Sequence, residues 1–139
     1  MVFIYAVEGD EATGPSARDL LACLRAHPGA ARTSELTLAE VLAPTKLRGG
    51  IPPALKSTYL QLLTSSWVEL TPVSRQILFK TVEIRSVGMK LPDAIHKATA
   101  VENECKYIVT KDSGMAAPAS VIKVQPDESG VGRIREALA

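Results

Sequence analysis

The chain has 139 residues, a length that fits one domain, and its hydrophobic fraction of 46% and charged fraction of 22% are typical of a globular protein. Its formal net charge of +1 excludes a strongly basic surface, so any contact with RNA must use a local cluster of cations. No apolar run approaches the roughly 20 residues that cross a bilayer, and two cysteines are too few for a disulfide framework, so we expect one cytoplasmic domain over residues 1–139 with free thiols.

Signals for helices and strands alternate along the chain. The apolar run at residues 2–7 fits either a buried strand or the first turns of a helix. Apolar stripes between capping signals and helix breakers predict helices over residues 16–26, 33–47, 53–63, 73–87, 92–105 and 130–139. Apolar or alternating segments predict strands at residues 67–71, 107–110 and 121–124. This order predicts an α/β domain with a mostly parallel sheet, helices on both faces and a site at the carboxyl ends of the strands.

Two aspartates lie at boundaries of predicted elements. Asp112 follows the strand at residues 107–110, where ligands gather in a parallel sheet, although a turn residue before Gly114 is an equal alternative. Asp93 lies in the first turn of a helix, and the helix dipole favours an ionised carboxylate there. Taken alone, Asp93 is better explained as a dipole-stabilising residue that pairs with Lys97 one turn later.

A third acid, Glu40, lies among apolar neighbours in the second predicted helix. Its spacing from Thr37 is that of a capping box, so its carboxylate could simply return to the start of its own helix. A carboxylate between leucines and valines is unfavourable without a partner, and a metal ion is one such partner. His96, in the same turn as Asp93, is expected to have a structural role rather than to be a ligand or a base.

Three segments, in this order and at these separations, resemble the PIN-domain ribonucleases and, among them, the VapC-like toxins. They are Ser34-Glu35-Leu36-Thr37-Leu38-Ala39-Glu40-Val41-Leu42, then Lys90-Leu91-Pro92-Asp93-Ala94-Ile95-His96-Lys97-Ala98-Thr99-Ala100, then Tyr107-Ile108-Val109-Thr110-Lys111-Asp112. The resemblance implies a three-layer α/β/α sandwich whose acidic pocket binds Mg²⁺ or Mn²⁺ and cleaves RNA. It places catalytic and metal-binding roles on Glu40, Asp93 and Asp112, with Thr110 as a supporting hydroxyl.

The family's first acid is missing from this sequence. In the family it belongs to a strand that ends in Asp-Thr-Asn and continues into an apolar run like residues 2–6, so that Met1 stands near the Asn position. By this comparison residues 2–8 begin a helix, and the strand before them is absent. Either the active protein starts further upstream, which we favour, or the chain is a degenerate nuclease. Glu8 and Asp10 have no geometric reason to replace the missing acid.

The leading hypothesis is therefore a toxin-like, Mg²⁺- or Mn²⁺-dependent endoribonuclease restrained by a cognate antitoxin, in a family whose members are often homodimers. Lys46, Arg48 and Lys111 are candidates for phosphate contact because they flank the acidic segments, although each is also explained as solvated surface charge. One alternative is a catalytically impaired PIN-like shell that binds protein or RNA. Another is an unrelated α/β domain whose acids are only caps and turn residues.

Overall fold

The computed structural model of the chain describes residues 2–45, 49–111 and 120–139. Its helices are α1 (Val2–Glu8), α2 (Gly14–Arg25), α3 (Leu36–Leu42), α4 (Pro53–Leu63), α5 (Arg75–Ile84), α6 (Leu91–Glu102) and α7 (Glu128–Leu138). Its strands are β1 (Ala31–Ser34), β2 (Val68–Thr71), β3 (Tyr107–Val109) and β4 (Ile122–Val124).

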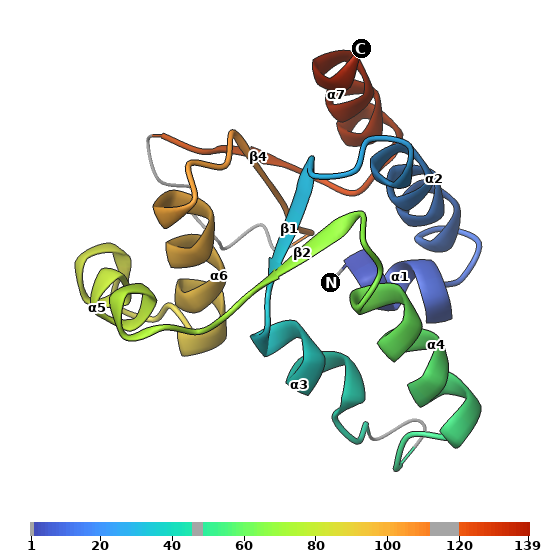
Figure 1. Cartoon of the computed structure of the whole chain (residues 1–139), viewed down its shortest axis with the longest axis horizontal. Helices are drawn as coiled ribbons and strands as arrows, with labels where there is room; N and C mark the ends of the chain where they lie inside the picture. The colour runs from blue at the N-terminus through green and yellow to red at the C-terminus, as the bar shows by residue number, and fades with distance from the viewer. Residues whose placement is uncertain (1, 46–48, 112–119) are drawn as a thin grey trace.

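The strands form two parallel pairs near the middle of the molecule (Figure 1). β1 pairs with β2, from Ala31 opposite Val68 to Ser34 opposite Thr71. β3 pairs with β4 in the same parallel sense. α3 and α4 lie between β1 and β2 along the chain, and both strand pairs are parallel, so the predicted α/β class with parallel strands is confirmed. Within the described residues the strands make two separate two-stranded sheets instead of one continuous sheet.

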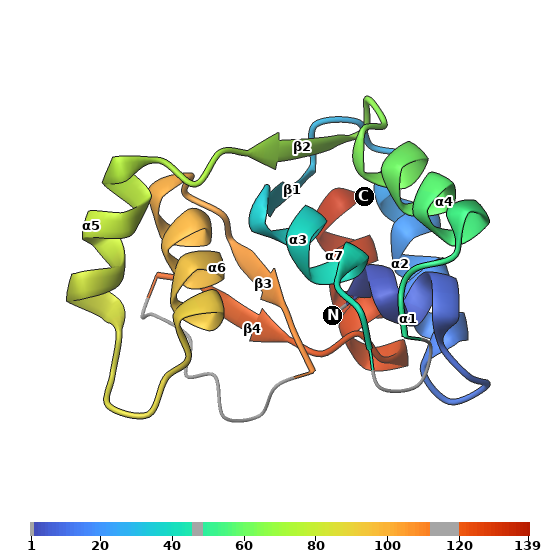
Figure 2. The ribbon, with the colours of Figure 1, turned by 90° about the horizontal axis from the view of Figure 1, so that it is seen from below.

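Helices cover the strands from two sides (Figures 1 and 2). On one side α5 packs on α6 through a cluster that contains Ile77, Ile95 and Ala98. On the other side, α1, α2, α4 and α7 lie together. This side holds two more clusters of buried apolar residues, one around Leu20 and one around Leu63. The strands are therefore sandwiched between helical layers, and the largest buried apolar groups lie at the junctions of helices.

The apolar run at the start of the chain is a helix, α1, which settles the choice that periodicity left open. Val2 packs against the cluster around Leu20, whereas Phe3, Ile4 and Val7 pack against the cluster around Leu63. Because α1 contacts two cores on different sides, it needs apolar residues on most of its surface. That explains why the run lacks the polar alternation of an amphipathic helix.

The prediction of a helix over residues 33–47 was wrong at its start, where the structure has β1 (Figure 1). The Arg32 guanidinium donates to Thr71 Oγ1 at 2.7 Å and to Glu69 Oε2 at 2.9 Å, so β1 is fixed by a strand almost forty residues away. A short polar strand of this kind has no local signal, because its stability comes from a distant partner. α3 starts only after Ser34, whose hydroxyl accepts from the Leu36 amide at 3.1 Å.

Other boundaries shift by a few residues. α5 ends at Ile84 and not at residue 87, and Gly88 adopts φ 86° in the turn that follows. α7 starts earlier than predicted, because the Asp127 side chain accepts from the Gly130 amide and caps the helix. The two cysteines are free and partly buried. None of the described helices has both the length and the apolar character needed to cross a membrane.

Candidate functional site

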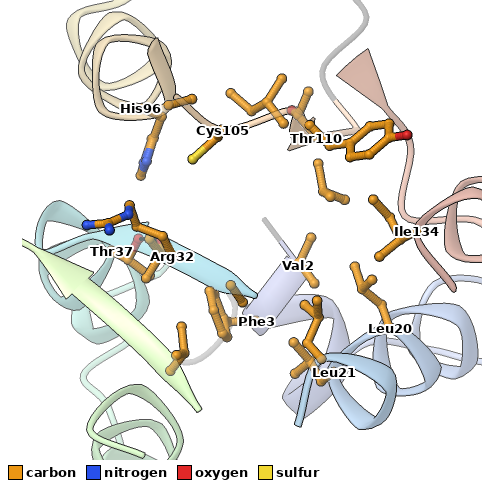
Figure 3. Close-up of a pocket in the computed structure, with 18 of the residues that line it drawn as sticks. Val2, Phe3, Leu20, Leu21, Arg32, Thr37, His96, Cys105, Thr110 and Ile134 are labelled. Atoms are coloured by element: carbon orange, nitrogen blue, oxygen red, sulfur yellow. Dashed lines mark hydrogen bonds between the residues drawn. The ribbon is translucent and has the colours of Figure 1, made fainter. Parts of the chain in front are cut away.

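A cavity of about 680 Å³ lies between β1 and β3 (Figure 3). Figure 3 shows side chains that converge on it from several elements: Val2 and Phe3 from α1, Leu20 and Leu21 from α2, Thr37 from α3 and His96 from α6. Polar groups gather where α3 and α6 meet the strands, while the wall formed by α1, α2 and α7 is apolar. The cavity therefore has a polar end and an apolar body.

Glu40 reaches this cavity from the middle of α3. The capping-box alternative does not occur, because Thr37 lies inside α3 and the N-cap position is Glu35. Instead, Glu40 Oε1 lies 2.8 Å from His96 Nε2, with about a fifth of each side chain exposed. Glu40 thus has the partner that its apolar neighbours require, and His96, which is 56 residues away in sequence, supplies it.

Asp93 lines the same cavity from the first turn of α6. This helix begins at Leu91 with Pro92 in its first turn, where proline's fixed φ and missing N–H suit a helix start. Asp93 and His96 are three residues apart and so lie on one face of α6. The structure thereby brings Glu40, Asp93 and His96 to one cavity from two helices.

Lys97 is the charged residue that the sequence paired with Asp93, and it is only 4% exposed. Burial lowers the pKa of its amine below the usual value, while the Asp93 carboxylate acts in the opposite direction. The ammonium is therefore held in an environment that disfavours its charge, and Asp93 partly offsets this effect.

We expect Lys97→Met to raise the free energy of unfolding at pH 7 by about 1 kcal/mol, because methionine fills similar space without a charge to desolvate. The gain should depend on pH. Since the folded pKa lies below the unfolded one, the unfolded chain holds the proton to higher pH, and wild-type stability rises as pH approaches the ordinary lysine value of 10.5. Urea unfolding of both proteins in EDTA at pH 7 and above 10 measures this. An advantage of the variant that fails to shrink at high pH contradicts the assignment.

The end of β3 supplies two more groups. Thr110 lines the cavity, and its amide donates to Val124 O at 3.0 Å, which fixes the backbone at the point where the strand ends. Lys111 follows it, with Nζ 5.4 Å from the centroid of the Tyr5 ring. The remaining predicted site residues, Asp112, Lys46 and Arg48, lie outside the described residues.

The acids near α1 have local roles. The Asp10 carboxylate accepts from the Ala12 and Thr13 amides at 3.0 Å and from the Thr13 hydroxyl at 3.1 Å, and these bonds lower its pKa. Glu8 accepts a hydrogen bond from the Tyr59 hydroxyl. Neither acid is among the residues that line the cavity. Both acids therefore stabilise local structure near α1.

Sequence reasoning did not identify three further groups at the cavity. Arg32 lines it, although Glu69 already neutralises its charge, and Thr37 accepts or donates a 2.7 Å hydrogen bond with Thr33. Cys105 is the third; burial raises the pKa of its thiol, and the positive charge of Arg32 opposes the shift. The strand that contains Arg32 and Thr33 was not predicted, so no sequence pattern indicated that either residue lies at the cavity.

The donors at the polar end are carboxylate oxygens and one imidazole. Carboxylates are the ligands that hard divalent cations prefer, so the type of donor fits Mg²⁺ or Mn²⁺. Within residues 2–45, 49–111 and 120–139, however, no group of three or more His, Cys, Asp or Glu side chains is placed to hold a metal ion. The described residues therefore do not form a metal site by themselves.

The sequence matches the family described as "PIN domain" over residues 1–120, which is most of the chain. No curated protein and no solved structure matches it.

Proposed function

Because the chain belongs to the PIN domain family, whose members are generally nucleases, we propose that it is a metal-dependent endoribonuclease of the toxin type. The observation that carries this proposal is that Glu40 and Asp93, on helices far apart in sequence, line one cavity between parallel strands. Carboxylates that line one cavity can share a divalent cation, whose charge offsets their mutual repulsion. An acidic metal site at the polar end of the cavity accounts for that convergence.

The residues that would hold the ion are Glu40, Asp93 and Asp112. When bound, a divalent cation lowers the pKa of a coordinated water and stabilises the charge that develops on phosphate. The chain's own groups have the supporting roles. The His96 imidazole restrains the Glu40 carboxylate through the 2.8 Å hydrogen bond, and Thr110 lies at the wall of the same cavity.

The substrate we propose is RNA, with Lys111 as a phosphate contact at the rim. We further propose a cognate antitoxin as the partner that restrains the enzyme. A homodimer is also proposed, as an expectation from the family rather than from a contact in the structure.

A second candidate is a catalytically impaired module that binds protein or RNA. Metal binding separates the two candidates, because the impaired module has no need of a divalent ion.

We expect Mn²⁺ to raise the melting temperature and to support RNA cleavage, and EDTA to abolish both effects. A ligand present at 100 times its Kd stabilises the folded state by about 2.7 kcal/mol, which is a shift of several degrees for a chain of this size. Differential scanning fluorimetry and a gel assay on a mixed-sequence RNA measure the two effects. If RNA binds but Mn²⁺ gives neither a thermal shift nor cleavage, the chain is the binding module and the enzyme proposal is wrong.

A further inference from the structure

We propose that α5 and the turn that follows it dock on an anionic lipid surface. The proposed function is not needed for this inference, because it concerns the outer face of α5 and not the cavity. Two properties coincide in residues 74–91: exposed apolar side chains and an excess of positive charge. A lipid surface with negative headgroups over an apolar interior matches both properties.

Exposed apolar side chains gather on α5 and on the turn between α5 and α6. Seven large hydrophobic residues are exposed in the described part of the chain, and five of them lie within residues 78–91. The five are Leu78, Phe79, Val82, Val87 and Leu91. Single exposed apolar residues are common on protein surfaces, whereas a cluster of them indicates an interaction site.

The helix separates an inner face from an outer one. Ile77 is 3% exposed and packs against α6. Val82 lies three residues after Phe79 and four after Leu78, so these three side chains share the opposite face of α5. Figures 1 and 2 show α5 on the outer side of α6, at the edge of the molecule. The apolar face therefore points away from the rest of the described chain.

Positive charge surrounds this face. Residues 74–91 contain one acid, Glu83, and four cations, in a chain whose net charge is only +1; the cations are Arg75, Lys80, Arg85 and Lys90. Lys80 Nζ lies 3.0 Å from Glu83 Oε2 and 3.6 Å from Glu102 Oε1, so these charges offset one another within the protein. The other three cations are exposed, and none of them forms an ion pair with a described residue.

The turn holds one apolar side chain at its tip. Gly88 adopts φ 86°, and Arg85 Nε donates to Met89 O at 3.0 Å across the turn. Val87 lies between these residues and is the most exposed of the five apolar residues. An apolar side chain that projects beside cations can enter the boundary between lipid headgroups and acyl chains.

The chemistry of the surface distinguishes a bilayer from two other occupants. A second copy of the chain would bring the same cations against one another, which is unfavourable. RNA would pair with the cations, but Val82 and Val87 have no ring on which a base can stack. An anionic bilayer offers headgroups to the cations and an apolar layer to Phe79, Val82 and Val87.

The experiment is sedimentation of the full chain with sucrose-loaded vesicles in EDTA. One set of vesicles is phosphatidylcholine alone, and the other is phosphatidylcholine and phosphatidylglycerol in equal parts. We expect at least about 10-fold tighter binding to the anionic vesicles, and weaker binding as NaCl is raised. In Phe79→Trp, tryptophan emission should shift to shorter wavelength on the anionic vesicles, with the wild type, whose Trp67 is buried, as background. Equal binding to both vesicles, or none, would overturn the proposal.

Matched variants test the location. Arg75→Gln with Lys90→Gln should weaken binding to the anionic vesicles at least about 10-fold, because each cation near such a surface contributes about 1 kcal/mol, or roughly fivefold. Arg133→Gln with Arg135→Gln removes the same charge from exposed positions on α7 and should change binding less than about twofold. Equal losses in the two pairs would contradict docking through α5.

A second comparison tests the apolar contact. Val87→Ser should weaken vesicle binding about fivefold, whereas Leu60→Ser, at an exposed position on α4, should not change it. Self-association without lipid that Val87→Ser abolishes would make the occupant a second copy. RNA affinity that falls in the Arg75 and Lys90 variant, together with absent vesicle binding, would make it a nucleic acid. No measurement on vesicles uses Mn²⁺ or RNA cleavage, so failure here is distinct from failure of the proposed nuclease.

Discussion

Asp93→Asn is expected to lower Mn²⁺-dependent RNA cleavage by at least about 100-fold. The change removes one proposed charged ligand while keeping the size of the side chain. A bound cation stabilises the transition state by several kcal/mol, and each 1.4 kcal/mol is a factor of 10 in rate. The thermal shift produced by Mn²⁺ should fall with the activity, because both depend on the same carboxylate. Cleavage of a labelled RNA and differential scanning fluorimetry, each with and without Mn²⁺, measure these losses.

The matched control is Glu128→Gln. Glu128 is also an acid in the first turn of a helix, but it is exposed on α7 and is not among the residues that line the cavity. Both substitutions weaken an interaction with a helix dipole, worth about 0.3–1 kcal/mol each, so a purely structural role predicts similar effects. Cleavage and Mn²⁺ response that survive Asp93→Asn unchanged would remove Asp93 from the proposed metal site.

The positions of Glu40 and Asp93 show how much of the candidate site could be predicted from sequence patterns. Each acid alone had a sufficient local explanation, a capping box for one and a helix dipole for the other. Their joint order along the chain, through the family resemblance, was the only signal that they share a site. The structure places them at one cavity, and the Glu40 carboxylate is hydrogen-bonded to the His96 imidazole instead of to the start of its own helix.

His96 and β1 could not be predicted for a common reason. The partner of His96 is 56 residues away, and that of Arg32 is 37 and 39 residues away. Periodicity and capping rules use only residues within a few positions of one another. They therefore identify amphipathic helices well and short polar strands poorly. The apolar patterns that predicted α6 and β3 lie within short stretches of the chain, so local rules detect them.

Division of the strands into two pairs also has a physical explanation. Parallel strands need buried faces and paired edges, and within residues 2–45, 49–111 and 120–139 β1 and β3 each have one strand partner. α6 closes one side of the gap, and α1, α2 and α7 close the other, so the two sheets are held in place by helices rather than by each other. The helical scaffold therefore sets the separation of the two strand pairs, and its stability decides whether the cavity between them keeps its shape.

Leu63→Ala is expected to lower the free energy of unfolding by about 2–5 kcal/mol, the usual range for removing a fully buried leucine. Leu63 is 0% exposed and packs with Val41 and Tyr59 at the junction of α3, α4 and α1. In a chain of this length the loss corresponds to a fall in melting temperature of roughly 10 °C. Urea unfolding and a thermal scan give both values.

Leu60→Ala is the matched control, because it removes the same atoms from the same helix at a position that is 36% exposed. Its effect should stay below about 1 kcal/mol. The difference between the two variants also tests how Glu40 is held. α3 has seven residues, too few for a stable isolated helix, so its position depends on Val41 in this cluster, next to Glu40 in sequence. Amide exchange in α3 should therefore accelerate in Leu63→Ala and not in Leu60→Ala; equal stability and equal exchange in the two variants would show that another contact fixes α3.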